Sequence, residues 1–102
     1  MRLDERSKDI IINAICKNFS EVFKIILFGS RVDNDKKGGD IDLLVETPSD
    51  MTSAFSEKIN ALAEMQTKLG ERKIDLITSC GVRDKRPVVK NAYRDGIILW
   101  EK

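Results

Sequence analysis

The order of helix-like and strand-like segments constrains the fold of this chain most strongly. Four short runs rich in β-branched and aromatic residues have the length and composition of strands; they span residues 22–28, 40–46, 73–78 and 97–100. Three other segments repeat apolar residues at helical spacing. The resulting order is helix, strand, strand, helix, strand, helix, strand. It predicts an α/β (α+β) fold in which helices pack against a small mixed β-sheet, and the 102 residues fit a single domain, 1–102.

The ends of the expected helices are marked by residues that favour such positions. The first helix covers residues 7–19 and the second ends at Leu69. The residues suited to helix starts are Ser7, Ser49, Asp50 and Pro87, and those suited to helix ends are Gly70 and Gly96. One face of the second helix is expected to pack inward and carries Phe55, Ile59, Leu62, Met65 and Leu69.

The charge balance and the apolar runs exclude several classes of protein. The 18 basic and 17 acidic residues nearly cancel, so no global field draws the chain to nucleic acid or to an anionic membrane. Apolar runs such as 25–28 and 97–100 fall far short of the roughly 20 residues that span a bilayer, and residues 1–9 are too polar for a signal peptide. We therefore expect a cytoplasmic protein that acts at neither a membrane nor, directly, a nucleic acid.

The sequence also limits the available chemistry. It contains no histidine, which removes the commonest general base, and its two cysteines, Cys16 and Cys80, lack any metal-ligand spacing. We expect both thiols to be free and without a catalytic role. Any reaction must then depend on carboxylates, hydroxyls, lysines and metal ions.

Three aspartates stand among apolar residues in the expected strands. Asp40 and Asp42 are two positions apart in one strand and therefore project to the same face, about 6 to 7 Å apart along the backbone. If the strand that carries Asp75 lies beside them, three carboxylates converge on one place. Mg²⁺ prefers hard oxygen ligands and keeps positions for waters or phosphates, so this set favours phosphoryl chemistry with one or two metal ions. The alternative is a set of solvated acids that only confer solubility.

The triplet Gly29-Ser30-Arg31 follows the first expected strand directly. A glycine allows a bend that directs main-chain N–H groups at an anion, and the serine hydroxyl adds a donor, so a triphosphate fits here. Ser30 alternatively caps a turn, and Arg31 alternatively holds the loop by an ion pair or contacts a partner. Arg83, Lys85, Arg86, Lys90 and Arg94 form a basic cluster that is expected to be a solvated helix face.

Together these motifs resemble a known family. Gly29-Ser30-Arg31 followed by Asp40-Ile41-Asp42-Leu43 is similar to the Gly-Ser, spacer, Asp-x-Asp signature of the DNA polymerase beta-type nucleotidyltransferase superfamily. The short chain and the segment from Tyr93 to Leu99 resemble its minimal nucleotidyltransferases, and Asp75 matches the third acid of the family. Nine residues, Arg31 to Gly39, separate Ser30 from Asp40, fewer than in many members that modify a toxin.

The resemblance implies an activity and a partner. It implies transfer of a nucleoside monophosphate, AMP from ATP, to a hydroxyl, with Asp40, Asp42 and Asp75 as catalytic Mg²⁺ ligands and Gly29, Ser30 and Arg31 at the nucleotide. It also implies pairing with a HEPN-domain toxin that this chain neutralises as an antitoxin. The alternative is a binding module that neutralises a HEPN partner by contact alone. The identity of the nucleotide and of the acceptor, and self-association of the chain, are left open by the sequence.

Overall fold

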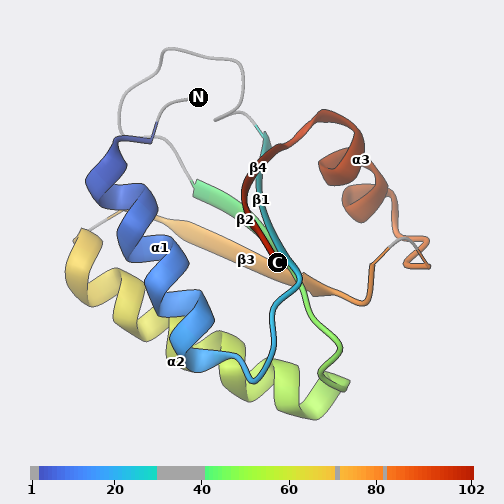
Figure 1. The fold of residues 1–102 in the computed structure, drawn as a ribbon, viewed down its shortest axis with the longest axis horizontal. Coiled ribbons are helices and arrows are strands. Elements are labelled where there is room, and N and C mark those ends of the chain that lie inside the picture. Colours follow the sequence, from blue (N-terminus) through green and yellow to red (C-terminus); the bar gives the residue numbers. More distant parts are fainter. Residues whose placement is uncertain (1–2, 30–40, 71, 82) are drawn as a thin grey trace.

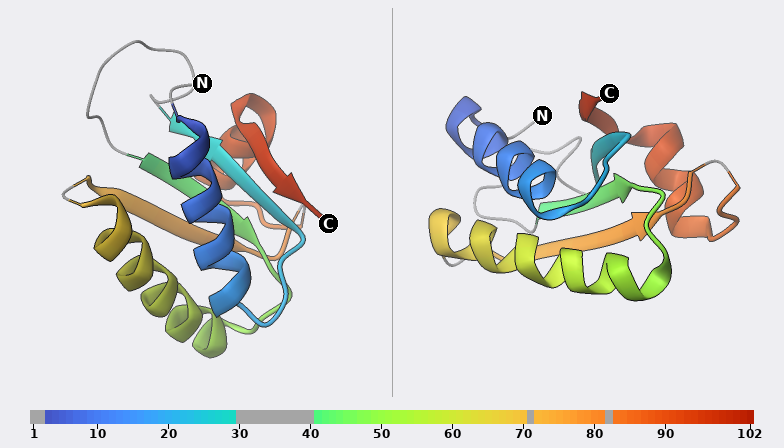
Figure 2. Two further views of the ribbon diagram at one scale, coloured as in Figure 1. Left: turned by 60° about the vertical axis from the view of Figure 1, so that its left-hand side comes forward. Right: turned by 60° about the horizontal axis from the view of Figure 1, so that its bottom comes forward.

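The computed structural model describes residues 3–29, 41–70, 72–81 and 83–102. The described elements follow the expected order: α1 (Glu5–Asn18), β1 (Lys24–Phe28), β2 (Ile41–Glu46), α2 (Met51–Leu69), β3 (Ile74–Ser79), α3 (Pro87–Asp95) and β4 (Ile97–Glu101). They form three layers, with α1 and α2 on one face of the sheet and α3 on the other (Figure 1; Figure 2). The prediction of helices packed against a small mixed sheet is confirmed.

The described strands form one sheet in the order β3-β2-β1-β4. β1 pairs antiparallel with both β2 and β4, whereas β2 and β3 are parallel. The parallel pair is made possible by α2, which carries the chain back to the edge at which β2 began. β2 is a central strand covered on both faces, and its residues Ile41, Leu43, Leu44 and Val45 are fully buried.

Alternation along the strands separates two hydrophobic clusters. Ile41, Leu43 and Val45 face α1 and α2 in the larger cluster, which also contains Ile11 and Met65. The smaller cluster, under α3, contains Ile26, Leu44, Val89 and Ala92. The larger cluster holds the two long helices against the sheet, and the smaller one fixes α3.

Several expected helix boundaries are correct and one is wrong. Asp50 caps α2 by accepting a hydrogen bond from the Ser53 backbone N–H (2.8 Å), and Pro87 stands at the first turn of α3. Ser7 does not cap α1. Asp4 does so instead, because its Oδ1 accepts from the Ser7 backbone N–H at 2.7 Å, which places Ser7 inside the first turn.

The expected inward face of α2 is partly wrong. The buried side chains of this helix are Ala54, Ala61 and Met65, while Phe55 and Ile59 are 64% and 49% exposed. Two alanines let the helix axis approach its neighbours closely, and β3 is the edge strand of the sheet, so little lies beneath the far side of α2. Figure 2 shows α2 running along that margin.

Two further expectations concern composition. Cys16 and Cys80 are free, as predicted, and the structure shows both to be exposed. Among the described segments, no helix combines the length and apolar character that crossing a bilayer requires.

Candidate active site

The two described aspartates of the motif lie side by side on one face of the sheet. In the parallel register of β2 and β3, Asp42 is directly opposite Asp75. Neighbouring strands are about 4.8 Å apart, and residues in register project to the same face, so the two carboxylates share one patch of surface. Asp42 is half-buried and Asp75 is exposed. The face is the one that α3 covers, since Leu44, two residues after Asp42, packs under α3.

Gly29 closes this patch from the neighbouring strand. The antiparallel register places Phe28 opposite Asp42, so Gly29 begins the turn next to the Asp42 carboxylate. Gly29 has a φ of +80°, a conformation that L side chains rarely adopt. A Cβ on this residue would stand 3.2 Å from Cγ of Asp42 and nearer still to its Oδ2. Glycine therefore both permits the turn and leaves the space that the carboxylate occupies.

The remaining residues of the motif fall in the segment that is not described. Ser30, Arg31 and Asp40 lie outside the described residues. Residue Ile41, which follows Asp40, donates its backbone N–H to the Lys73 carbonyl at 2.9 Å, so the pairing of β2 with the chain before β3 extends to the end where Asp40 attaches. Within the described residues, no three Asp, Glu, Cys or His side chains gather at one point.

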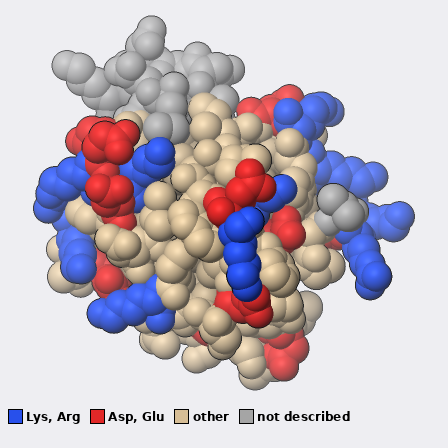
Figure 3. Space-filling model, viewed as in Figure 1, with Lys and Arg blue, Asp and Glu red and all other residues tan. Residues whose placement is uncertain are grey.

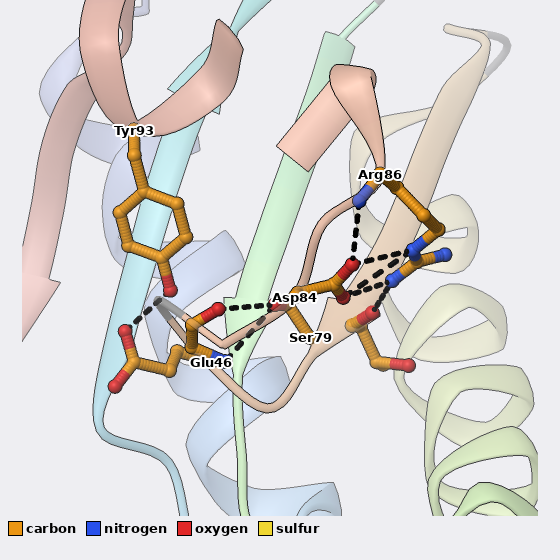
Figure 4. Close-up of polar contacts among 7 residues, drawn as sticks. Glu46, Ser79, Asp84, Arg86 and Tyr93 are labelled. Carbon is orange, nitrogen blue, oxygen red and sulfur yellow. Dashed lines mark hydrogen bonds and ion pairs between the residues drawn. The ribbon is translucent and has the colours of Figure 1, made fainter. Parts of the chain in front are cut away.

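Helix α3 is tied to β2 at Glu46, four residues along the strand from Asp42. The Tyr93 hydroxyl donates to Oε1 of Glu46 at 2.5 Å, and Glu46 is the last residue of β2 (Figure 4). Burial and the neighbouring Glu46 carboxylate raise the pKa of Tyr93, so the hydroxyl stays protonated. Sequence reasoning missed this contact, because it joins residues 47 positions apart.

A second tie holds the start of α3. The Arg86 guanidinium donates to both carboxylate oxygens of Asp84 and to the Thr78 carbonyl, the last contact at 2.7 Å (Figure 4). The hydrogen bonds from Arg86 hold the pKa of Asp84 well below its usual range. Arg94 pairs with Asp95 at 2.9 Å. The space-filling view shows the Lys and Arg side chains of this region spread on the surface over α3, as expected for a solvated face (Figure 3).

One cleft of about 430 Å³ lies far from the aspartate pair. It opens where β2 and β3 end, and its lining includes Thr47, Thr78, Cys80 and Arg86. Its acid, Asp84, is already engaged by Arg86. Among the residues that the structure describes, Asp84 is the acid in the lining of this cleft.

The carboxylate patch suits a hard metal ion. Both described donors are carboxylates, the ligand type that Mg²⁺ prefers, and two acids on adjacent strands repel each other unless a cation lies between them. The Gly29 backbone leaves the Asp42 carboxylate room at the edge of the patch. The residues present therefore fit Mg²⁺ and a phosphate group bound to it.

Comparison with known proteins agrees with this chemistry. The family model described as polymerase beta, nucleotidyltransferase, matches residues 11–102. The chain therefore belongs to the polymerase beta nucleotidyltransferase family, and the predicted class of enzyme, a nucleotidyltransferase, is confirmed at that level. No curated protein matches the sequence.

Solved structures with this fold include several toxin–antitoxin assemblies. A mutant of the toxin–antitoxin pair MntA–HpeT superposes with a TM-score of 0.69 at 19% identity, covering 93% of this chain and 73% of that one. A complex of tri-AMPylated Shewanella oneidensis HEPN toxin with MNT antitoxin gives 0.67 at 20% identity, covering 98% and 74%. A toxin–antitoxin structure with AMP-PNP gives 0.69 at 21% identity, covering 93% and 73%. At these identities the likeness establishes the fold.

Proposed function

We propose that this chain is a magnesium-dependent nucleotidyltransferase that moves AMP from ATP to a hydroxyl group on a HEPN-domain toxin, acting as its antitoxin. The observation that carries the proposal is the pairing of Asp42 with Asp75 on adjacent parallel strands, beside the glycine turn that ends β1. The family model supports the reaction class. The neighbours with a tri-AMPylated HEPN toxin and with AMP-PNP support the nucleotide and the partner.

The proposed roles follow from the resemblance of these residues to the family motif. Asp40, Asp42 and Asp75 hold Mg²⁺; when bound, the metal neutralises phosphate charge and lowers the pKa of the attacking hydroxyl. Gly29, Ser30 and Arg31 bind the triphosphate through backbone N–H groups, the hydroxyl and the guanidinium. Asp75, the exposed acid, faces the acceptor and assists removal of its proton.

The reaction is a single in-line displacement in this proposal. The acceptor oxygen bonds to the α-phosphorus of ATP, the bond from that phosphorus to the bridging oxygen breaks, and pyrophosphate leaves. The acceptor proton passes to solvent by way of Asp75. On a toxin, the added AMP places a phosphate charge and a bulky nucleoside on its surface, which opposes RNA entry by repulsion and by volume.

The decisive experiment is coexpression with a HEPN-domain protein from the same genome, followed by intact-mass measurement of that protein. We expect mass additions of AMP units with the wild type and none with Asp42→Asn or Asp75→Asn. Asp95→Asn is the matched control, since it removes an exposed carboxylate on α3 that pairs only with Arg94. Retained modification in both site variants would sink the metal-ligand roles.

The binding-module alternative gives a different result in the same experiment. Neutralisation by contact is supported if the toxin forms a tight complex but is not modified, and if Asp42→Asn binds the toxin as tightly as the wild type does. Thermal melts add a second readout, because Mg²⁺ and ATP at about a hundred times the dissociation constant stabilise a protein by about 2.7 kcal/mol. We expect that stabilisation in the wild type and its loss in Asp42→Asn.

A further inference from the structure

Helix α2 carries an apolar stripe that the fold leaves uncovered. Met51, Phe55 and Ile59 follow one another at four-residue intervals and are 89%, 64% and 49% exposed. Ala63, also exposed, continues the row for another turn. Large apolar side chains gathered on a surface, in contrast to single ones, mark a site of interaction.

The two acidic residues of α2 are directed to the other side of the helix. Glu57 accepts hydrogen bonds from the Ser20 and Ser49 hydroxyls at 2.6 and 2.8 Å, and Glu64 accepts one from the Asn18 amide at 3.2 Å. Successive residues are about 100° apart around a helix, so these acids lie roughly opposite Phe55. The stripe therefore faces away from α1.

The outer side of the stripe lacks charge. The residues beside it on that side of α2 are Thr52, Ser56, Asn60, Gln66 and Thr67. Lys58 borders it on the sheet side, where its long side chain can carry the ammonium into solvent. In a chain of which 34% is charged, an uncharged sector of this length has the composition of an interface centre. Figure 3 shows the lower margin of the molecule, along which α2 runs, as mostly tan.

We propose that two copies of this chain pair through the stripe, α2 against α2 and antiparallel. A toxin that receives AMP must reach Asp42 and Asp75, which lie on the α3 face of the sheet, so its hydroxyl does not enter from the α2 layer. Because the net charge of each copy is only +1, electrostatic repulsion between two copies is weak. The dimer leaves both carboxylate patches open to acceptors.

The stripe is complementary to itself in this orientation. A two-fold axis on the stripe, at the level midway between Phe55 and Ile59 along the helix, places Phe55 of one copy against Ile59 of the other, and Met51 against Ala63, so large side chains meet smaller ones across an isologous contact. α2 has 19 residues and is about 28 Å long, and a contact between two such single helices is small beside the specific range of about 1,200–2,000 Å². We therefore expect a dissociation constant in the micromolar range.

Sedimentation velocity over about 1–300 µM tests the dimer. The wild type is expected to move from a mass of 11.6 kDa toward twice that value. Phe55→Lys and Ile59→Lys are expected to stay monomeric, and the matched control Val88→Lys, at a residue 42% exposed on α3, to dimerise like the wild type. Circular dichroism checks that each variant is folded. A wild type that is monomeric throughout, or a dimer that resists Phe55→Lys, overturns the proposal.

Cysteine cross-linking tests the orientation. In a Cys16→Ser, Cys80→Ser background, mild oxidation of the double variant Met51→Cys, Ala63→Cys is expected to give a covalent dimer on a non-reducing gel. Each single cysteine is expected to give none, because the two copies of one position are far apart in an antiparallel pair. A covalent dimer from Met51→Cys alone, or none from the double variant, overturns the pairing. Neither experiment uses nucleotide or toxin, so both outcomes are independent of the proposed function.

Discussion

Replacement of Gly29 by alanine separates two effects that meet at the aspartate patch. The first is backbone strain: Gly29 has a φ of +80°, and a residue with a Cβ held at positive φ costs about 1–3 kcal/mol. The second is steric: the new Cβ would stand 3.2 Å from Cγ of Asp42 and nearer to Oδ2, so the carboxylate must move. We expect loss of Mg²⁺–ATP binding in addition to a lower stability.

Gly70→Ala isolates the first effect. Gly70, which caps α2, has nearly the same φ of +81°, but apart from its chain neighbours no atom of the described residues lies within 4 Å of a Cβ built there. Both variants should therefore lose about 1–3 kcal/mol, which corresponds to a fall in Tm of about 4–8 °C for each kcal/mol in a domain of this size. In Gly29→Ala alone, the new Cβ also displaces the Asp42 carboxylate, which adds about 1 kcal/mol to the loss of stability.

The assay is a thermal melt with and without Mg²⁺ and ATP, run beside labelled-AMP transfer. Ligand at about a hundred times its dissociation constant adds about 2.7 kcal/mol, and we expect this gain in the wild type and in Gly70→Ala. Gly29→Ala should show no gain and no transfer. If Gly29→Ala binds and transfers like Gly70→Ala, the contact between the turn and the Asp42 carboxylate is not what prepares the site.

Three other substitutions test residues around the sheet. Ser30→Ala should weaken ATP binding without unfolding the chain, because it deletes one hydrogen-bond donor to the phosphates. Equal ATP affinity of mutant and wild type in titrations would show that the hydroxyl only caps a turn. Tyr93→Phe should cost about 1.5–3 kcal/mol, because it removes the hydrogen bond to the Glu46 carboxylate; denaturant unfolding measures it. Because folding raises the pKa of Tyr93, the hydroxyl adds its full amount to the free energy of unfolding below pH 10, and this amount falls as the pH rises above 10. A difference in unfolding free energy between wild type and Tyr93→Phe that stays constant to pH 12 would contradict this. Gly96→Ala should cost about 1–3 kcal/mol, because its Cβ would press on the Ile26 side chain, and an unchanged melting curve would refute that close packing.

Much of the fold could be predicted because its signals are local. Strand segments, the Asp50 cap and Pro87 at the start of α3 all depend on residues close in sequence. The prediction that Ser7 caps α1 was wrong for the same reason. Ser7 and Asp4 are both residue types that favour the cap position, and only the hydrogen bond from the Ser7 N–H to Asp4 shows which of them is the cap. Local rules rank residue types but do not choose between two candidates three positions apart.

Long-range contacts account for what the sequence could not provide. The exposure of Phe55 and Ile59 depends on β3 being the edge strand, a fact of sheet order that helical periodicity does not contain. The Tyr93 bond to Glu46 joins residues 47 positions apart. The juxtaposition of Asp42 with Asp75 likewise required the parallel register of β2 and β3. The roles proposed for these acids, and for Ser30, Arg31 and Asp40, stay predictions.

The place of Asp75 on the edge strand has a consequence for substrate selectivity. Among the described strands, β3 has a neighbour on one side only, so a hydroxyl group carried by a large molecule can approach Asp75 from beyond the sheet. In the proposed reaction, the described residues at this edge therefore give a small acceptor few walls to contact and little basis for choosing among hydroxyl groups by size. In the proposed reaction, the choice of modified residue is therefore made by how the acceptor protein presents its own side chain, and a flexible tail bearing a hydroxyl would be modified more readily than one fixed in a helix.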